Sequence, residues 1–351
     1  MIHVGVDLHQ RFCYVTAVKT SGELIVQRSV ANEAEILRQL LRSLPGPRQV
    51  VVEACGFWPA FARAVESEAE RVVMVHPQRV KAIASARLKN DRVDSATLAH
   101  LSRCDLLPQA WMADEATRQL RLRVRLRVRL GQQRARAKNL LQGVLHQEGF
   151  RQPVTDVFGK RGRQWLQAIG LSPAARVVVD TQLRLIERIS ELIAEQEQAL
   201  AKLAAADARA GWLQTVPGIG PYAAMVILAE VGEVGRFATK RALASYAGLV
   251  PRVRESAGKR SYGGISRAGS ETLRWMMLQV AQVAVQHSPA ARACYARLQV
   301  RKRPQVAKVA VARKLLMAVW ALLRHGVCYD DEVFAAPSSG AKDGARRLGN
   351  R

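Results

Sequence analysis

The chain has 351 residues, enough for more than one domain, and 49% of them are hydrophobic, which excludes a wholly disordered protein. Lys and Arg number 54 against 29 Asp and Glu, and the resulting net charge of +25 repels itself unless a polyanion neutralises part of it. Nucleic acid is the usual partner of such a chain, and a membrane protein is disfavoured because no run of about 18 apolar residues occurs.

Residues 1–109 predict an α/β domain. Strands alternating with helices imply a sheet with parallel members. Short runs rich in β-branched residues indicate strands, and amphipathic segments between them indicate helices: strands at residues 4–7, 12–18, 24–30, 49–53 and 71–75, helices at 33–44 and 59–68.

Four acids of this domain stand at the ends of predicted elements. Asp7 and Glu53 end strands, while Asp91 and Asp94 open a helix and share one face of it at i, i+3. Clustered carboxylates bind Mg²⁺, which serves phosphodiester chemistry by neutralising the attacking and leaving oxygens. The four acids are therefore candidate Mg²⁺ ligands and catalytic residues. Each has a structural alternative, such as Asp91 capping its helix.

Residues 110–206 predict a helical connector, in which residues 181–203 suit a long exposed or coiled-coil helix. Residues 120–130 fit both the alternation of a strand and the spacing of a helix, and helix is favoured. Between residues 118 and 138 there are eight arginines and one lysine but no acid, and residues 272–329 hold ten Lys or Arg and no acid. Such one-sided charge predicts contact with phosphates. The alternating candidates are Arg121, Arg123, Arg125, Arg127 and Arg129.

Residues 207–335 predict a mainly helical domain, followed by a disordered tail at 336–351. Gly218 and Gly220 stand in a V-P-G-I-G-P turn before an Ala-rich helix, a pattern typical of a helix-hairpin-helix element. Glycines there let the backbone approach a DNA phosphate at the N-terminus of the following helix. A tight interhelical turn is the alternative.

Residues 248–269 predict a polar, glycine-rich loop of unusual length, and such loops are often functional. Cations around a serine would hold a scissile phosphate and offset the charge that develops during attack. The residues alone leave four serines as candidates: Ser256, Ser261, Ser266 and Ser270. The candidate cations are Arg252, Arg254, Lys259, Arg260 and Arg267.

The five cysteines are scattered and form no C-x-x-C pair. They predict neither a disulfide framework nor a zinc site, and they fit a reducing cytoplasm.

Taken together, these motifs resemble the insertion-sequence-110 type transposases, including the related pilin-gene invertases, over nearly the whole chain. The resemblance rests on G-V-D at Asp7, V-E-A-C-G at Glu53, K-N-D-R-V-D at Asp91 and Asp94, P-G-I-G-P at Pro217, and G-L-V-P to S-R-A-G. It implies an RNase-H-like (Holliday-junction-resolvase-like) domain with a D-E-D-D set of metal-binding acids, and a helical transposase domain with a catalytic serine.

Residue by residue, the resemblance implies that Asp7, Glu53, Asp91 and Asp94 bind metal. It also implies that Ser256, in an S-x-G-K stretch, is the nucleophile that links covalently to DNA. The family further implies a noncoding guide RNA, double-stranded donor and target DNA, and action as a dimer or tetramer.

The sequence therefore predicts a recombinase that cuts and rejoins DNA through a phosphoserine intermediate. Two alternatives stay open: a metal-dependent junction nuclease whose serine loop only binds DNA, and a noncatalytic nucleic-acid-binding protein. Whether the acids and the serine meet within one chain or across subunits is also open.

Overall fold

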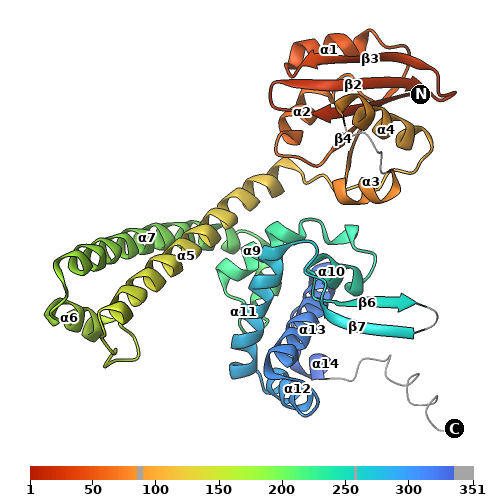
Figure 1. The fold of residues 1–351 in the computed structure, drawn as a ribbon. Coiled ribbons are helices and arrows are strands. Elements are labelled where there is room, and N and C mark those ends of the chain that lie inside the picture. Colours follow the sequence, from red (N-terminus) through yellow and green to blue (C-terminus); the bar gives the residue numbers. More distant parts are fainter. Residues whose placement is uncertain (85–89, 257–258, 336–351) are drawn as a thin grey trace, which may run out of the picture. The chain divides into compact units, whose positions relative to one another are not determined.

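The computed structural model describes residues 1–84, 90–256 and 259–335; the predicted disordered tail lies outside these ranges. The chain divides into two compact units, residues 1–113 and a second unit that begins at Asp114 (Figure 1). Each unit has its own core and is described by itself. The domain boundaries expected after residues 109 and 206 remain predictions.

A five-stranded sheet forms the centre of the first unit, in the order β3-β2-β1-β4-β5. β2 runs antiparallel to β1 and β3, whereas β4 runs parallel to β1 and β5. All five predicted strands are confirmed, and so is the expectation of parallel members. The strands are β1 (Ile2–Leu8), β2 (Phe12–Lys19), β3 (Leu24–Ala31), β4 (Arg48–Glu53) and β5 (Arg71–Val75).

Helices cover both faces of this sheet (Figure 1). On one face the apolar sides of α1 and α2 pack against Val4 and Val6, and on the other Leu98 and Leu101 of α4 pack against Val51. No helix is predicted from the sequence directly after the strand at residues 71–75, but Pro77 occupies the first position of α3, where proline favours the start of a helix. The helices are α1 (Ala34–Arg42), α2 (Trp58–Val65), α3 (Pro77–Ile83) and α4 (Asp91–Arg103).

The second unit opens with two long helices that run side by side, α5 (Glu115–Gln147) and α7 (Pro173–Ala205), joined through α6 (Lys160–Ala168) (Figure 1). The ambiguous residues 120–130 are helical, which confirms the favoured prediction. Val124 and Val128 lie four residues apart and are buried on one face. Because that spacing matches the helical period, burial of this stripe decides the conformation in favour of helix.

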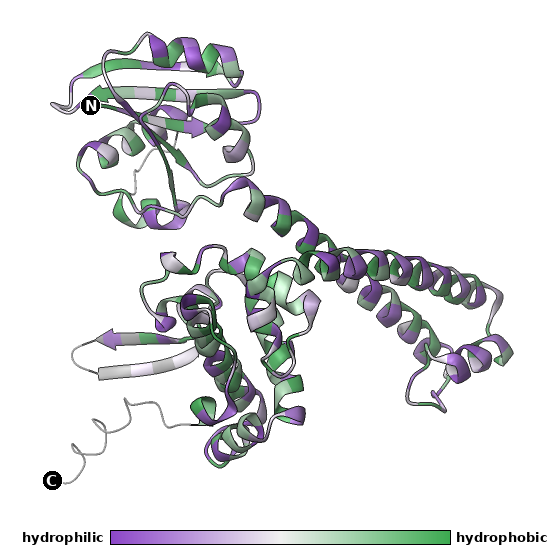
Figure 2. Ribbon diagram, turned by 180° about the vertical axis from the view of Figure 1, so that it is seen from behind, coloured by the Kyte–Doolittle hydropathy of each residue, from purple (hydrophilic) through white to green (hydrophobic). Residues whose placement is uncertain are grey.

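The rest of the second unit surrounds α9, whose residues 223–231 are all buried. A helix that is apolar all round is stable only inside a core, and hydrophobic residues accordingly mark these helices in Figure 2. The elements are α8 (Ala208–Gln214), α9 (Pro221–Val231), the 3-10 turn η1 (Val234–Arg236), α10 (Lys240–Tyr246), β6 (Pro251–Ser256), β7 (Lys259–Ile265), α11 (Glu271–His287), α12 (Pro289–Gln299), α13 (Pro304–His325) and α14 (Asp331–Ala335).

The predicted serine loop is wrong in its secondary structure. Strands β6 and β7 pair antiparallel, with Val253 opposite Tyr262 and Ser256 opposite Lys259. Alternating charged residues concealed the strand pattern, and glycines suggested a loop. The second unit is therefore helical with one added β-hairpin.

Two further expectations concern the cysteines and the membrane. All five cysteines are free thiols, as their scattered positions predicted. None of the described helices is both long and apolar enough to cross a membrane.

Candidate functional site

Helix α4 lies directly on the backbone of β1, and this close approach places its acids. A Cβ atom added at Gly5 would lie 2.1 Å from the carbonyl oxygen of Ser95 and 2.5 Å from the amide nitrogen of Ala99. Two buried side-chain hydrogen bonds also hold α4 on the sheet: His3 Nδ1 on β1 lies 2.8 Å from Ser102 Oγ, and Thr16 Oγ1 on β2 lies 2.8 Å from Ser95 Oγ. Only glycine at position 5 permits this packing.

We expect Gly5→Ala to lower the free energy of unfolding by about 3 kcal/mol, because the added methyl group meets backbone that cannot move aside. Gly56→Ala is the matched control, since a Cβ atom there meets nothing within 4 Å. Urea-unfolding midpoints of the two full-length variants provide the test. Equal midpoints would show that α4 does not depend on Gly5.

Three side chains meet where β1 ends and α4 begins. The imidazole Nε2 of His9 lies 3.3 Å from Asp7 Oδ2 and 3.4 Å from Asp91 Oδ2. One donor atom from each of the three lies within 4.8 Å of the others. His9 Nε2 is enclosed and has no hydrogen-bond partner of good geometry among the described residues. Two carboxylate oxygens and an imidazole nitrogen at this spacing form a donor set that fits a divalent cation.

The other two predicted acids stand beside this cluster. Gly5 and Val51 are paired on the neighbouring parallel strands β1 and β4, and Asp7 and Glu53 lie two residues further along them. Because strand side chains alternate, both acids stand on the face that α4 covers. Asp94 shares the first turn of α4 with Asp91, and the helix is capped by Asn90, which accepts from the Val93 amide. Asp91 is therefore not the cap.

The local electrostatics follow from this crowding. Burial raises the pKa of the Asp7 carboxyl, and the negative charges of Asp91 and Asp94 raise it further, while His9 opposes them. A bound cation would relieve this repulsion between carboxylates. His9 was missed by the sequence analysis.

The hairpin β6–β7 separates the four candidate serines by position. Ser270 caps α11: its oxygen accepts from the Leu273 amide, and its hydroxyl donates to Glu230 Oε2 at 2.8 Å. Ser266 stands at the base of the hairpin with its hydroxyl oxygen enclosed. Ser261 is exposed on β7, and Ser256 is the last residue of β6. Ser270 therefore has a structural role as the cap of α11. Ser256 and Ser261 lie further along the hairpin.

Among the candidate cations of the hairpin, Arg252 and Arg267 are exposed. Arg267 adopts a left-handed backbone, with φ of 55°, in the turn between β7 and α11. The backbones of the other three lie close to Ser256 in register, since Arg254 pairs with Ser261, Glu255 with Arg260, and Ser256 with Lys259. All five therefore belong to one hairpin and its exit turn.

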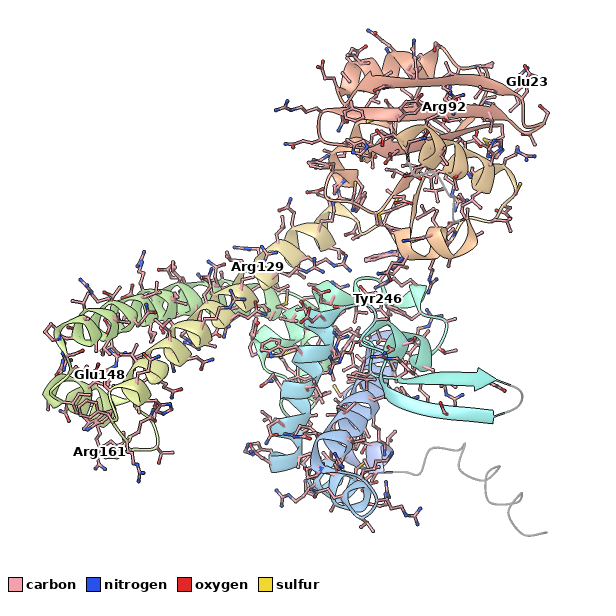
Figure 3. The ribbon with its side chains drawn as sticks, in the orientation of Figure 1. Glu23, Arg92, Arg129, Glu148, Arg161 and Tyr246 are labelled. Carbon is pink, nitrogen blue, oxygen red and sulfur yellow. The ribbon has the colours of Figure 1, made fainter. Side chains whose placement is uncertain are left out.

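The five alternating arginines of α5 divide into two groups. Arg121 donates to the Ala229 carbonyl at 2.8 Å, Arg125 pairs with Glu230, and Arg127 pairs with Glu197 and lies 4.6 Å from the ring centre of Tyr222. These three help to hold α5 on the helical core. Arg123 and Arg129 are exposed, and Arg129 is labelled on α5 in Figure 3.

The two glycines of the V-P-G-I-G-P turn also differ. Gly218 has φ of 92°, and a Cβ atom there would lie 2.8 Å from the Val280 carbonyl oxygen on α11. Gly218 thus permits both the turn and close packing, whereas a Cβ atom at Gly220, the N-cap of α9, would meet nothing within 4 Å. The turn joins α8 to α9, and its role as a helix-hairpin-helix element stays a prediction.

Two models of known protein families match this chain, one over the residues that hold the four acids and one over most of the helical core with the hairpin. A DEDD transposase model of the IS110 group matches residues 4–149, and the model described as "Transposase IS116/IS110/IS902 family" matches residues 210–296. This chain belongs to the IS110 family of transposases. It is accordingly a DNA-recombining enzyme of the transposase class, and the DEDD match implies the use of a divalent metal ion.

Relatives align along most of their length with this IS110-family transposase. A probable family 20 transposase of Pseudomonas aeruginosa is 27% identical over 93% of this chain and 98% of its own. The transposase for insertion sequence element IS1111A of Coxiella burnetii is 27% identical over 93% and 90%. A pilin gene-inverting protein of Moraxella bovis is 25% identical over 81% and 82%.

Proposed function

We propose that this transposase cuts and rejoins DNA by transesterification, with Ser256 as nucleophile and with Mg²⁺ held by Asp7, Glu53, Asp91 and Asp94. The observation that carries the proposal is the convergence of Asp7 and Asp91, with His9 between them, from β1 and the first turn of α4. Clustered carboxylates beside a phosphodiester are the usual basis of metal-assisted phosphoryl transfer.

We further propose that the first unit is an RNase-H-like domain. Support comes from its strand order, β3-β2-β1-β4-β5. In this order β2 lies between β3 and β1 and runs antiparallel to both. The acids then stand at the end of the central strand β1, at the end of its parallel neighbour β4, and on the helix that covers them.

The donor set favours a hard cation. Carboxylate oxygens suit Mg²⁺, which when bound would neutralise charge on the oxygens of the scissile phosphate. Asp7 and Asp91, whose carboxylates approach the same imidazole, would hold it together with the neighbouring Glu53 and Asp94. His9 stands within reach of both carboxylates and would fix their geometry.

Ser256 would supply the covalent step. Its oxygen loses its proton and forms a bond to phosphorus while the bond from phosphorus to the departing DNA oxygen breaks, and the departing oxygen takes up a proton in exchange. One phosphodiester replaces another, so rejoining by the reverse step needs no ATP. A serine hydroxyl is a weak nucleophile at neutral pH, and Lys259 and the nearby arginines would stabilise the charge that develops.

The partners follow from the charge and from the family. Double-stranded donor and target DNA would lie on exposed cations, including Arg123, Arg129 and those of the hairpin. The backbone at Gly218 and Gly220 would contact a phosphate at the start of α9. A noncoding guide RNA and a dimeric or tetrameric assembly remain proposals that rest on the resemblance.

The experiment that tests this function uses a plasmid carrying the gene with its native flanking DNA. Strand exchange that requires both Mg²⁺ and Ser256 supports the proposal. Sequencing of nucleic acid that copurifies with the full chain tests the guide: a single recurrent noncoding RNA supports it, and its absence from active protein contradicts it.

The exposed arginines of α5 give a separate prediction. Replacing Arg123 and Arg129 with Gln should reduce the slope of log affinity against log salt by about one unit or less per lost phosphate contact, with unchanged stability.

Arg125→Gln, by contrast, leaves the buried Glu230 carboxylate without its cation. It should lower the free energy of unfolding by about 3 kcal/mol, at the lower end for a buried pair because Arg125 is half-exposed. Salt titrations and unfolding curves distinguish the two; an unchanged slope would remove α5 from the binding surface.

A further inference from the structure

Glu230, near the end of α9, is completely buried, and its carboxylate joins two distant parts of the second unit. Arg125 on α5 donates from Nε to Oε1 at 2.8 Å and from Nη2 to Oε2 at 3.0 Å. The Ser270 hydroxyl donates to Oε2 at 2.8 Å. A buried carboxylate is costly unless it is both paired with a cation and hydrogen-bonded, and Glu230 meets both conditions.

Ser270 stands at the base of the hairpin β6–β7, where the chain is tightly interlocked. Its amide donates to the Tyr246 carbonyl at 2.9 Å, beside the hairpin (Figure 3). A Cβ atom at Gly269 would lie 1.9 Å from that same oxygen, and one at Gly248 would lie 2.4 Å from the Ala268 carbonyl oxygen. Arg274 donates to the Ala247 carbonyl at 3.1 Å. The two chain ends that enter and leave the hairpin are therefore held against each other.

A buried ion pair often adds no more to the free energy of unfolding than well-packed apolar residues of similar size would. The directional bonds of such a pair do fix geometry. Here the bonds of Glu230 end on Ser270, the first capping residue after the hairpin. The bonds of Glu230 thus reach the residue at which the chain leaves the base of the hairpin.

We propose that Glu230 is a positioning residue for recombination: through Ser270 it fixes the base of the hairpin and so sets where Ser256 stands. This inference rests on the proposed nucleophilic role of Ser256.

A small change at the base is amplified along the hairpin. The five residue steps from Pro251 to Ser256, at about 3.3 Å each, span about 17 Å. A tilt of about 5° at the base would then move Ser256 by about 1.5 Å, and a displacement of about 1 Å is enough to cost roughly 100-fold in rate. Loss of the Ser270 bond should therefore lower catalysis far more than stability.

The structure supplies a matched control. Ser288 caps α12 in the same way: its oxygen accepts from the Ala291 amide at 3.0 Å, and its hydroxyl donates to Asp331 Oδ1 at 2.9 Å. Ser288 lies between α11 and α12 and not at the base of the hairpin. Ser270→Ala and Ser288→Ala thus each remove one cap and one hydroxyl–carboxylate bond, and both leave the Arg125–Glu230 pair intact.

The test compares these two full-length variants with wild type. We expect equal losses of thermal stability. In Ser270→Ala alone, amide hydrogen exchange in residues 251–256 and 259–265 should be about 10-fold faster, and the rate of protein–DNA adduct formation on the native-flank plasmid should fall roughly 10- to 100-fold at saturating DNA. Ser270→Thr, which keeps the hydroxyl, should restore both. Identical exchange and adduct rates in Ser270→Ala and Ser288→Ala would overturn the inference.

The two readouts keep this inference separate from the proposed function. Hydrogen exchange requires no DNA chemistry, so it tests the positioning role even if wild-type protein forms no adduct at Ser256, a result that would refute the proposed function. Unchanged exchange together with a wild-type adduct on Ser256 would refute the positioning role alone.

Discussion

Ser256→Ala is expected to abolish recombination and the covalent protein–DNA adduct while leaving DNA affinity and thermal stability at wild-type values. Removing a covalent nucleophile eliminates the chemical step, and comparable substitutions in other enzymes cost roughly 10⁴-fold or more in rate. Stability should hold because the change removes one hydroxyl from the end of β6. The assay is strand exchange on the native-flank plasmid, with DNA binding measured separately by titration.

Ser261→Ala is the control for that prediction. Ser261 is exposed on β7, five residues beyond Ser256, and its change also removes one hydroxyl from the hairpin. We expect a rate within a few-fold of wild type. Robust recombination by Ser256→Ala, or its loss in Ser261→Ala, would contradict the assignment.

Asp91→Asn is expected to abolish strand cleavage with the fold intact. Asparagine keeps the size of the side chain, and the cap of α4 belongs to Asn90, so the helix should still begin at the same residue. The change removes one of the two carboxylates that approach His9, at 3.4 Å. Asp94→Asn, in the same turn, should also abolish cleavage, because Asp94 is another of the four proposed Mg²⁺ ligands.

Asp105→Asn is the control for charge, because it removes one acid just beyond the other end of α4. Asp105 is exposed and has φ of 54°, a backbone conformation that asparagine adopts readily. Calorimetric titration with Mg²⁺ should show weaker binding in Asp91→Asn and wild-type binding in Asp105→Asn. Unchanged binding in both would mean that the acids have a structural role, as in the noncatalytic alternative.

Much of the first unit could be predicted because each strand is a short run of β-branched residues bounded by turn residues. Asp7 and Glu53 stood out for the same reason, since both end such runs. His9 did not, although it lies only two residues beyond Asp7. Its place depends on the turn after β1, where its amide donates to the Phe12 carbonyl and its ring lies 4.6 Å from that of Phe12. No spacing rule encodes that turn.

The arginines of α5 show a second limit. Their charge correctly suggested an unusual role, but the partner of Arg125 lies 105 residues away in the sequence. Only the packing of α5 on α9 reveals that Arg121 and Arg125 hold the core while Arg123 faces outward. The hairpin was missed for a related reason. Its strands are held by pairing with each other and by the close packing of the backbone at Gly248 and Gly269, and not by an alternating hydrophobic pattern that the sequence would show.

The most direct test of the central claim is the position of the covalent bond to DNA. Trypsin cuts after Arg254 and Lys259 and releases residues 255–259, in which Ser256 is the only hydroxyl-bearing residue. The next hydroxyls, including Ser261 and Ser266, leave together in residues 261–267. Mass spectrometry of an adduct trapped on native-flank DNA should place a nucleotide on residues 255–259. A nucleotide on residues 261–267, or no adduct from a preparation that recombines DNA, would contradict the account.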